Sequence, residues 1–208
     1  MQLMKQHWDK VYDVNESEKL GWYEETPEKC LELFDKCNIN KQDAVIDIGC
    51  GTSSFIENLL DKGFTNLIGL DISEIALEKF RQMLGKKSSS VKLILDNIGN
   101  PEKVQKLHGI ALWHDRAVLH FLLDYKEQQN YLLTLKSILR KNGYAIIATF
   151  NLSGAKKCSG LNTKNYDKNM LAEFLGSDFK LLESFDYIYR TPFGSERPYV
   201  YTLFKKIF

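Results

Sequence analysis

Residues 45–55 read VIDIGCGTSSF, an apolar run that ends in an acid and then in two glycines separated by one residue. The run has the composition of a buried strand, and the apolar stripe of Phe55, Ile56, Leu59 and Leu60 that follows predicts a helix. A glycine-rich turn between a strand and a helix is typical of sites that hold a nucleotide-like ligand. The stretch therefore raises the question of which ligand the turn holds.

Composition indicates one ordinary globular domain. The chain has 208 residues, of which 44% are apolar and 26% charged, and its net charge is +1. This balance gives no electrostatic reason to expect a nucleic acid or an anionic membrane as partner. The start, MQLMKQHWDK, lacks the apolar core of a signal peptide, and no run approaches the roughly 20 apolar residues that span a bilayer.

Cysteine usage points to a reducing compartment. Four cysteines occur without a C-x-x-C pair: Cys30, Cys37, Cys50 and Cys158. Such scattering argues against a structural zinc site and against a disulfide framework. We therefore expect a cytoplasmic protein with no metal.

Continuous apolar runs alternate with helical patterns along most of the chain. Runs of the kind found in strands buried on both faces lie at 44–48, 66–70, 91–95, 110–114 and 144–149. Helical stripes lie between them: one closed by Gly63, one from Ser73 to Gly85, and one at 132–139 that we expect to end at Asn142-Gly143. This alternation predicts an α/β fold, a doubly wound and mostly parallel sheet with helices on both faces.

Both ends of the chain depart from this alternation of strands and helices. Thr26-Pro27 predicts the cap and first position of a helix that runs to about Cys37. Near the other end, 179–190 and 199–207 read as two strands joined by a turn, which predicts a terminal hairpin. We expect a single domain over 1–208: an N-terminal helical cap (1–40), a ligand-binding core (41–150), and a segment with a substrate loop, a helix and the hairpin (151–208).

The glycine turn does not match a pyrophosphate site. The third glycine of the dinucleotide fingerprint would fall at Ser54, and the chain has no G-x-x-x-x-G-K-[ST] loop. Asp47, two residues before Gly49, would repel a pyrophosphate in a low-dielectric pocket. It would suit a phosphate-free nucleoside with a positive end, and S-adenosylmethionine has that chemistry.

Two further acids follow the next two strands. Asp71 comes 20 residues after Gly51, where a carboxylate can accept hydrogen bonds from both ribose hydroxyls. Asp96 closes the third strand, where it would accept from the exocyclic amine of adenine. Because parallel strands deliver their carboxyl ends to one rim, we expect Asp47, Asp71 and Asp96 to gather there. Taken singly, Asp71 and Asp96 could equally begin a helix or end a strand.

Over roughly residues 40 to 150 the chain resembles the class I S-adenosylmethionine-dependent methyltransferases, which show acid-x-Gly-x-Gly after the first strand and an acid after the second and third. Ser53 stands where many members carry a third glycine. The resemblance implies seven strands with an antiparallel last strand, S-adenosylmethionine as cofactor and S-adenosylhomocysteine as product. It extends the cofactor site from the motif residues to their neighbours Cys50, Ile72 and Asn97.

The acceptor site is expected after the fourth strand, which reads ALWHDRAVLHFL. In the family this strand ends near the sulfonium, so we assign catalytic roles to His114, Asp115 and Arg116. A histidine with a pKa near neutrality, His114 or His120, would be a general base, and Arg116 would steer an anionic acceptor. Alternatively, Asp115 and Arg116 form a local ion pair and His120 packs beside Phe121.

Other segments are candidates for the walls of the site. Tyr12 and Trp22 would close over the cofactor, or merely dock the first helix. Cys158 in the loop after the fifth strand and Arg197 in the hairpin are candidates for substrate contact, although an incidental cysteine and a surface arginine are the alternatives.

The whole chain resembles small bacterial methyltransferases of mostly unassigned substrate and, more distantly, thiopurine-type and lysine-directed methyltransferases. We expect in-line methyl transfer to a small molecule, because the loops are short and no basic face is evident. A protein (lysine-type) methyltransferase is the alternative, and a module that only binds S-adenosylmethionine is a non-enzymatic one. The sequence leaves the acceptor atom and the oligomeric state open.

Overall fold

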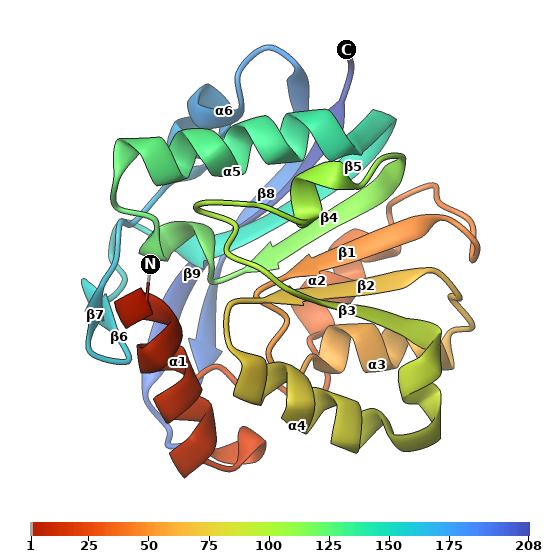
Figure 1. Ribbon diagram of the computed structural model, residues 1–208. Coiled ribbons are helices and arrows are strands. Elements are labelled where there is room, and N and C mark those ends of the chain that lie inside the picture. Colours follow the sequence, from red (N-terminus) through yellow and green to blue (C-terminus); the bar gives the residue numbers. More distant parts are fainter. Residues whose placement is uncertain (1) are drawn as a thin grey trace.

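A seven-stranded sheet forms the centre of the molecule, for which the computed structural model describes residues 2–208. Its strand order is β3-β2-β1-β4-β5-β9-β8 (Figure 1). The strands are β1 (Ala44–Ile48), β2 (Leu67–Asp71), β3 (Val91–Leu95), β4 (Ile110–Arg116), β5 (Leu139–Phe150), β8 (Phe179–Arg190) and β9 (Glu196–Lys206). The strand β9 is antiparallel to both of its neighbours, β5 and β8, and the other six strands run in one direction. The mostly parallel sheet with an antiparallel last strand is therefore confirmed.

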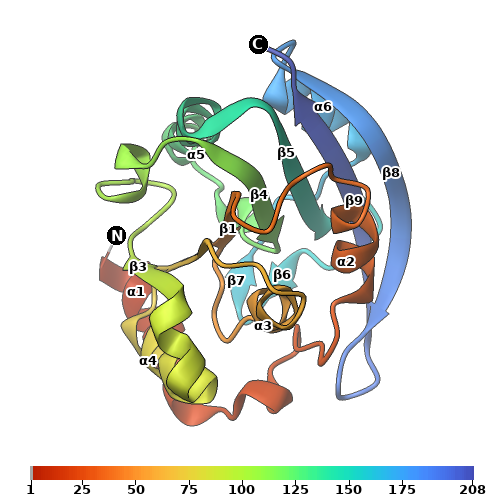
Figure 2. The same ribbon diagram turned by 90° about the vertical axis from the view of Figure 1, so that its right-hand side faces the viewer.

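Helices cover both faces of this sheet. One face packs against α2 (Glu28–Phe34), α3 (Ser54–Asp61) and α4 (Glu74–Leu84), and the other against α5 (Tyr125–Ile138) and α6 (Lys168–Leu175). Short 3₁₀ turns connect the elements: η1 (Ser17–Lys19), η2 (Gly85–Ser90), η3 (Val104–Lys106) and η4 (Leu119–Phe121). Figure 2 shows β8 curving along the outer edge of the sheet. No helix within the described part of the chain is long and apolar enough to cross a membrane.

Two side-chain layers make the core because the central strands are buried on both faces. Val45, Leu112 and Ile146 pack in the layer below α2, α3 and α4, while Ile46, Trp113 and Ile147 pack below α5 and α6. Successive strand residues point to opposite faces. The continuous apolar runs of the sequence therefore supply both layers at once, as expected for parallel strands.

Three expected helix boundaries were wrong. Pro27 is the residue before α2 and not its first turn, Thr26 does not cap it, and the helix ends at Phe34. The helix α5 stops at Ile138, so Asn142 and Gly143 lie inside β5. Leu139 is buried and pairs with Ile110, and the register then shifts until Leu112 pairs with Tyr144. The shift needs the left-handed Asn142 (φ 62°) and a glycine next to it, because a Cβ at Gly143 would lie 2.9 Å from the carbonyl oxygen of Arg140.

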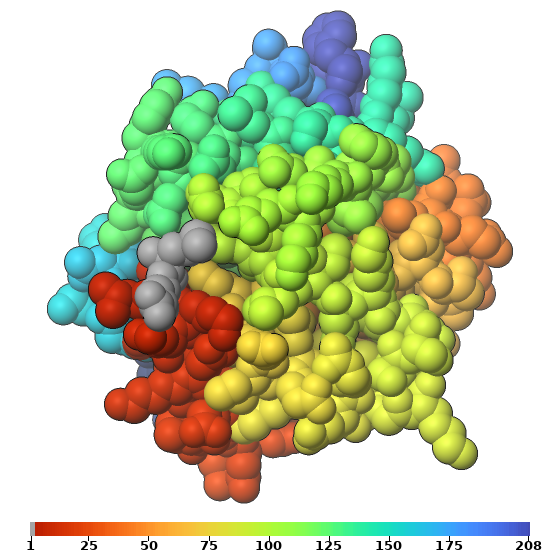
Figure 3. All heavy atoms as spheres, viewed as in Figure 1, coloured from red at the N-terminus to blue at the C-terminus, as the bar shows by residue number. Residues whose placement is uncertain are grey.

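Two small elements lie at the edge where the parallel strands end. The N-terminal helix α1 (Gln2–Val14) packs against α4, as the space-filling view shows (Figure 3). The short antiparallel hairpin of β6 (Lys157–Cys158) and β7 (Leu161–Asn162) is separate from the main sheet (Figure 1). The carboxyl edge of the sheet is thus covered by chain segments from both ends of the sequence.

A buried polar network ties β4 to α5. The indole nitrogen of Trp113 donates to the hydroxyl of Tyr131 at 3.0 Å, and this hydroxyl donates to the carboxylate of Asp115 at 2.7 Å. Asp115 also accepts from the backbone amides of Val118 and Leu119. The network fixes the chain where it leaves β4, because buried polar groups must keep their partners.

The substitution Tyr131→Phe should destabilise the protein without altering its fold. It leaves the Trp113 donor unpaired and removes one bond from Asp115, for an expected loss of about 1–3 kcal/mol in the free energy of unfolding. Urea unfolding monitored by circular dichroism measures this. Tyr125→Phe is the matched control, because Tyr125 is 74% exposed. Equal stabilities of the two variants would contradict the assigned role of the network.

Candidate functional site

The glycine turn after β1 is shaped by two residues with left-handed backbones. Gly49 has φ 64° and Gly51 has φ 51°. A Cβ at Gly49 would lie 2.1 Å from a methyl carbon of Val118, and one at Gly51 would lie 2.1 Å from the hydroxyl oxygen of Tyr12. Only glycine meets both the backbone and the space requirement. The turn therefore lets the segments after β4 and in α1 approach closely.

Cys50 points away from this approach. Its sulfur would lie 2.8 Å from a Cβ at Gly69, so it packs against β2. Burial raises the pKa of the thiol, with Asp71 and Asp47 adding to the effect. Cys50 therefore stays protonated and acts as a packing residue of the turn.

Asp71 connects the turn to the start of α4. Its carboxylate accepts from the backbone amide of Gly51 at 2.8 Å and from that of Ser73 at 2.8 Å. Burial raises the pKa of Asp71 to about 6, although these two amides oppose the shift. Asp71 also lines the pocket described below, and a carboxylate can accept more hydrogen bonds than the two from these amides.

Asp47 forms a buried ion pair with His114. The carboxylate lies 2.6 Å from Nδ1 of the imidazole and accepts from the hydroxyl of Ser53 at 2.5 Å. The imidazole stacks on Phe55, with ring centroids 3.9 Å apart. Burial alone would lower the pKa of His114, but the charge of Asp47 outweighs it and raises this pKa to about 10. This corrects the expectation that His114 titrates near neutrality. As a cation, its imidazole has no free lone pair with which to accept a proton.

Asp115 points to the opposite face of the sheet from His114 and Arg116, into the network with Tyr131. No side chain of that network lines the pocket. Burial raises the pKa of Asp115 to about 6. Neither the expected catalytic contact nor the alternative ion pair with Arg116 occurs, because neighbouring residues of a strand face opposite sides.

Arg116 reaches across the end of the sheet to the segment after α1. Its Nη1 donates to the carbonyl oxygen of Trp22 at 2.8 Å, and its Nη2 lies 3.1 Å from a carboxylate oxygen of Glu24. The guanidinium carbon lies 4.9 Å from the ring centre of Tyr189 and 5.2 Å from that of Tyr199. The side chain is 9% exposed. Arg116 is therefore a buried cation held between rings and one carboxylate, and Glu24 was not foreseen from the sequence.

His120 is neutral. It packs against Phe121 and Phe150, with ring centroids 4.4 and 4.6 Å away. Burial, assisted by the charge of Arg116, lowers its pKa to about 3. Such a weak base cannot take a proton effectively at neutral pH, so His120 is also not the expected general base.

Asp96 has the most fully occupied carboxylate of the three rim acids. It accepts from the backbone amides of Asn97, Glu102, Lys103 and Val104. These bonds close the loop between β3 and η3 around the side chain. Four amides match the four lone pairs of a carboxylate, so the adenine amine expected as its partner finds no free lone pair here.

One hollow joins these groups, with about 910 Å³ of empty space including its open mouth. Of the residues assigned to the cofactor, seven line it: Tyr12, Trp22, Gly49, Asp71, Ile72, Asp96 and Asn97. Asp47 and Cys50 line a smaller adjoining hollow of about 540 Å³, which shares Trp22, Gly49 and Arg116 with the first. We call the larger one the site pocket.

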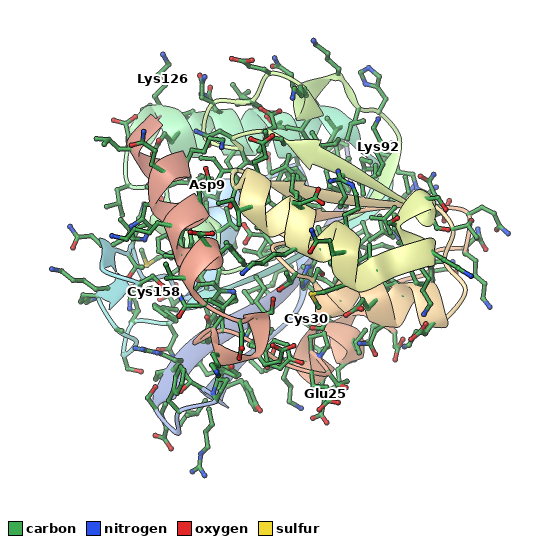
Figure 4. All side chains as sticks on the ribbon, turned by 60° about the horizontal axis from the view of Figure 1, so that its bottom comes forward. Asp9, Glu25, Cys30, Lys92, Lys126 and Cys158 are labelled. Atoms are coloured by element: carbon green, nitrogen blue, oxygen red, sulfur yellow. The ribbon has the colours of Figure 1, made fainter. Side chains whose placement is uncertain are left out.

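Of the two residues expected to contact substrate, Cys158 and Arg197, only Cys158 lines the site pocket. Cys158 in β6 lines the site pocket, and burial raises the pKa of its thiol, although Arg197 opposes the shift (Figure 4). Arg197 lies in β9 opposite Tyr189 and does not line the pocket.

Aromatic side chains of the N-terminal segment roof the pocket. Trp8 packs edge-on against Trp22 and Phe121, with centroids 5.6 and 5.1 Å apart. The helix that carries Trp8 is fastened by Asp9, which accepts from the hydroxyl of Ser73 at 2.8 Å (Figure 4). Tyr12 and Trp22, which were expected to close over the cofactor, both line the pocket. Trp8 and Phe121 also line it but were not predicted as pocket residues.

Metal ligands do not gather in this region. Among residues 2–208, no three His, Cys, Asp or Glu side chains lie together in a way that would hold an ion. The four cysteines are free thiols.

Known proteins share both the sequence pattern and the fold. Residues 39–189 match the sequence profile of a family described as a methyltransferase domain. The chain is 26% identical over 161 residues to EEF1A lysine methyltransferase 2 of Danio rerio, covering 71% of this chain and 68% of that protein. The mouse protein of the same name is 24% identical over 166 residues, with 73% and 67% covered.

Solved structures agree at the level of the fold. The crystal structure of an S-adenosylmethionine-dependent methyltransferase from Anabaena variabilis superposes with a TM-score of 0.80 at 19% identity, covering 99% of this chain and 94% of that one. The N-methyltransferase NodS of Bradyrhizobium japonicum, solved with S-adenosylhomocysteine, gives a TM-score of 0.70 at 13% identity, with 95% and 97% covered.

The sheet order, the glycine turn and these matches together define a class, the S-adenosylmethionine-dependent methyltransferases with a Rossmann-like sheet. The chain belongs to the methyltransferase domain family, whose profile spans most of it. The expected enzyme class and its cofactor, S-adenosylmethionine, are confirmed.

The pair of Asp47 and His114 should make stability depend on pH. Because the pKa of His114 rises from 6.5 to about 10 on folding, its contribution is complete below pH 6.5 and is lost as the pH approaches 10. The wild-type free energy of unfolding should therefore fall over this range more steeply than that of His114→Gln. The exposed His108 provides the control His108→Gln, which should keep the wild-type slope. Parallel slopes for all three proteins would exclude a charged His114.

Asp71 should make cofactor binding depend on pH in the opposite sense. A ribose hydroxyl needs the ionised carboxylate as acceptor, so the affinity for S-adenosylhomocysteine should decline as the pH falls through about 6. Asp71→Asn should bind about tenfold more weakly at pH 8 and lose this dependence. Calorimetric titration measures both effects, with the exposed Asp61→Asn as control. Unchanged affinity in Asp71→Asn would refute the ribose contact.

Proposed function

We propose that this enzyme transfers the methyl group of S-adenosylmethionine to a small-molecule acceptor bound inside the site pocket. The observation that carries this proposal is the roof over the pocket. Trp8, Tyr12 and Trp22 cover the glycine turn and are fastened to α4 and β4 through Asp9 and Arg116. Most of the residues that line the pocket are apolar or aromatic, and a few polar groups lie among them, as in small-ligand sites.

The cofactor would occupy the part of the pocket next to β1, β2 and β3. In this arrangement Asp71 accepts from the ribose, Gly49 and Gly51 lie under the chain between ribose and sulfur, and Ile72 packs on the base. The rings of Tyr12 and Trp22 offer their faces to the sulfonium, since a cation is attracted to the negative face of an aromatic ring. Asp47 would support the cofactor site without contacting the cofactor. Its carboxylate is paired with His114 and Ser53, and this pairing holds the glycine turn in place.

The acceptor would occupy the other part, beside Arg116, Phe121, Tyr199 and Cys158. Three of these side chains are apolar or aromatic in character, and the fourth is a buried guanidinium. A flat acceptor that is neutral or anionic suits this lining. A free ammonium would meet the positive charge of Arg116 at short range, although Glu24 offsets part of that charge.

Methyl transfer then proceeds by in-line displacement. The acceptor's lone pair forms a bond to the methyl carbon as the carbon–sulfur bond breaks, and the bonding electrons stay on sulfur as its positive charge disappears. The described histidines near the pocket supply no base, because His114 is already protonated and His120 has a pKa of about 3. The chain therefore contributes alignment and the exclusion of water, and the acceptor reacts in a form that is already nucleophilic.

A protein lysine acceptor is the second candidate, and the relatives support it. Two curated proteins that the chain matches are named as EEF1A lysine methyltransferase 2. A groove that shares Glu24 with the surroundings of Arg116 is lined by three acids, Glu24, Glu25 and Glu28, and by two bases, Lys29 and Arg190. It offers a place for a basic side chain to approach. Simple retention of the cofactor without turnover is the non-enzymatic alternative.

Labelling separates these candidates. The enzyme, S-adenosylmethionine with a radioactive methyl group, and a cell extract split at about 3 kDa are combined. We expect label in the small-molecule fraction and not in the protein fraction. Label in protein alone supports the lysine candidate, and no label in either fraction, with the cofactor still bound, supports a binding module.

Arg116→Met should separate acceptor binding from cofactor binding. Losing a buried, hydrogen-bonded cation at the acceptor end should lower kcat/KM for the labelled acceptor at least about tenfold. The affinity for S-adenosylhomocysteine should change about threefold or less. Arg81→Met, on the exposed face of α4, is the matched control and should leave both unchanged. Equal losses of acceptor turnover and cofactor affinity would contradict the division of the pocket.

A further inference from the structure

Three side chains bring oxygen acceptors to the end of the site pocket next to β3: Asp96, Asn97 and Glu127. Their place follows from the strand order. Since β2 separates β3 from the glycine turn, a nucleoside with its ribose at Asp71 extends its base toward the loop after β3. The edge of such a base would then face these three residues.

The protein itself uses the carboxylate of Asp96 fully and the side-chain oxygen of Asn97 in part. The carboxylate of Asp96 accepts four backbone amides at 2.7 to 3.2 Å. The side-chain oxygen of Asn97 accepts from the amide of Gly99 at 2.9 Å. A new donor at Asp96 would have to displace an amide that closes the loop, which would leave a polar group of the backbone unpaired.

Glu127 differs from both. Within residues 2–208 its carboxylate makes no hydrogen bond or ion pair. Its stem is nevertheless held in place: a Cβ at Gly99 would lie 3.2 and 3.3 Å from Cβ and Cγ of Glu127. Asn130, on the same helix, donates to the carbonyl oxygen of Gly99 at 2.8 Å. The first turn of α5 therefore carries an unpaired, partly buried carboxylate against the loop that faces the base.

We propose that Glu127 accepts a hydrogen bond from the exocyclic amine of adenine and thereby selects an adenine-containing cofactor. The amine is a donor, and a carboxylate is acceptor-only when ionised. A base with a carbonyl oxygen at the same position would place that oxygen against the carboxylate of Glu127. Both groups are acceptors, so no hydrogen bond could form between them. Glu127 thus distinguishes an adenine from a hypoxanthine, a role that the sequence analysis had assigned to Asp96.

Two product analogues test this assignment: S-adenosylhomocysteine and S-inosylhomocysteine, which differ in the amine and the carbonyl. Calorimetric titration gives the ratio of their affinities for each variant. The wild type should prefer the adenine form at least about tenfold. Glu127→Gln should bring the ratio close to one, because an amide both donates and accepts. The exposed Glu173→Gln is the matched control and should keep the wild-type ratio.

Two results would overturn the proposal: a wild type that does not distinguish the analogues, and a Glu127→Gln variant that keeps the wild-type ratio. In the second case Asp96→Asn is titrated in the same way, and a lowered ratio there would assign the amine to Asp96. A thermal unfolding scan of each variant verifies that it is folded. No methyl acceptor takes part in these titrations, so they are independent of the proposed substrate class.

Discussion

The buried ion pair between Asp47 and His114 is the interaction on which the site depends. The two residues lie opposite each other in neighbouring parallel strands, so the pair joins β1 to β4 where the glycine turn begins. Ser53 donates to the same carboxylate and caps α3 through the amide of Ile56. One acid therefore holds a strand, a turn and a helix together. Removing one partner of such a pair costs about 3–5 kcal/mol, because the other charge is left buried and uncompensated.

The three rim acids look alike in sequence but do different work. Asp47 neutralises a histidine, Asp96 closes a loop with backbone amides, and Asp71 divides its lone pairs between two amides and the pocket. The partners separate these roles: Asp96 is bound by amides of the loop that follows it, whereas Asp47 is bound by His114, 67 residues away. An acid at the end of a parallel strand therefore indicates the edge of the sheet where a ligand would bind. Its hydrogen bonds show whether the acid faces that ligand or stabilises the neighbouring loops.

Much of the fold follows from local pattern. The apolar runs at 44–48 and 66–70 correspond closely to β1 and β2, because strand propensity and burial on both faces coincide there. The run at 179–190 corresponds to the edge strand β8. The helical spacing of apolar residues wrongly predicted that the helix continues through Leu139. Leu139 instead begins β5, because it pairs with Ile110 of β4. Gly85, in contrast, ends α4 as expected, because its left-handed backbone (φ 52°) is a local property.

By itself the sequence determined the class of protein: the turn at 45–55, the order of strands and helices, and the enzyme family with its cofactor. Each of these depends on residues that are close in the chain or on spacing. Only the tertiary structure decided the charge states of His114 and His120, the direction of Asp115, and the meeting of Arg116 with Glu24. Those properties depend on burial and on charges tens of residues away, and no spacing in the chain encodes them.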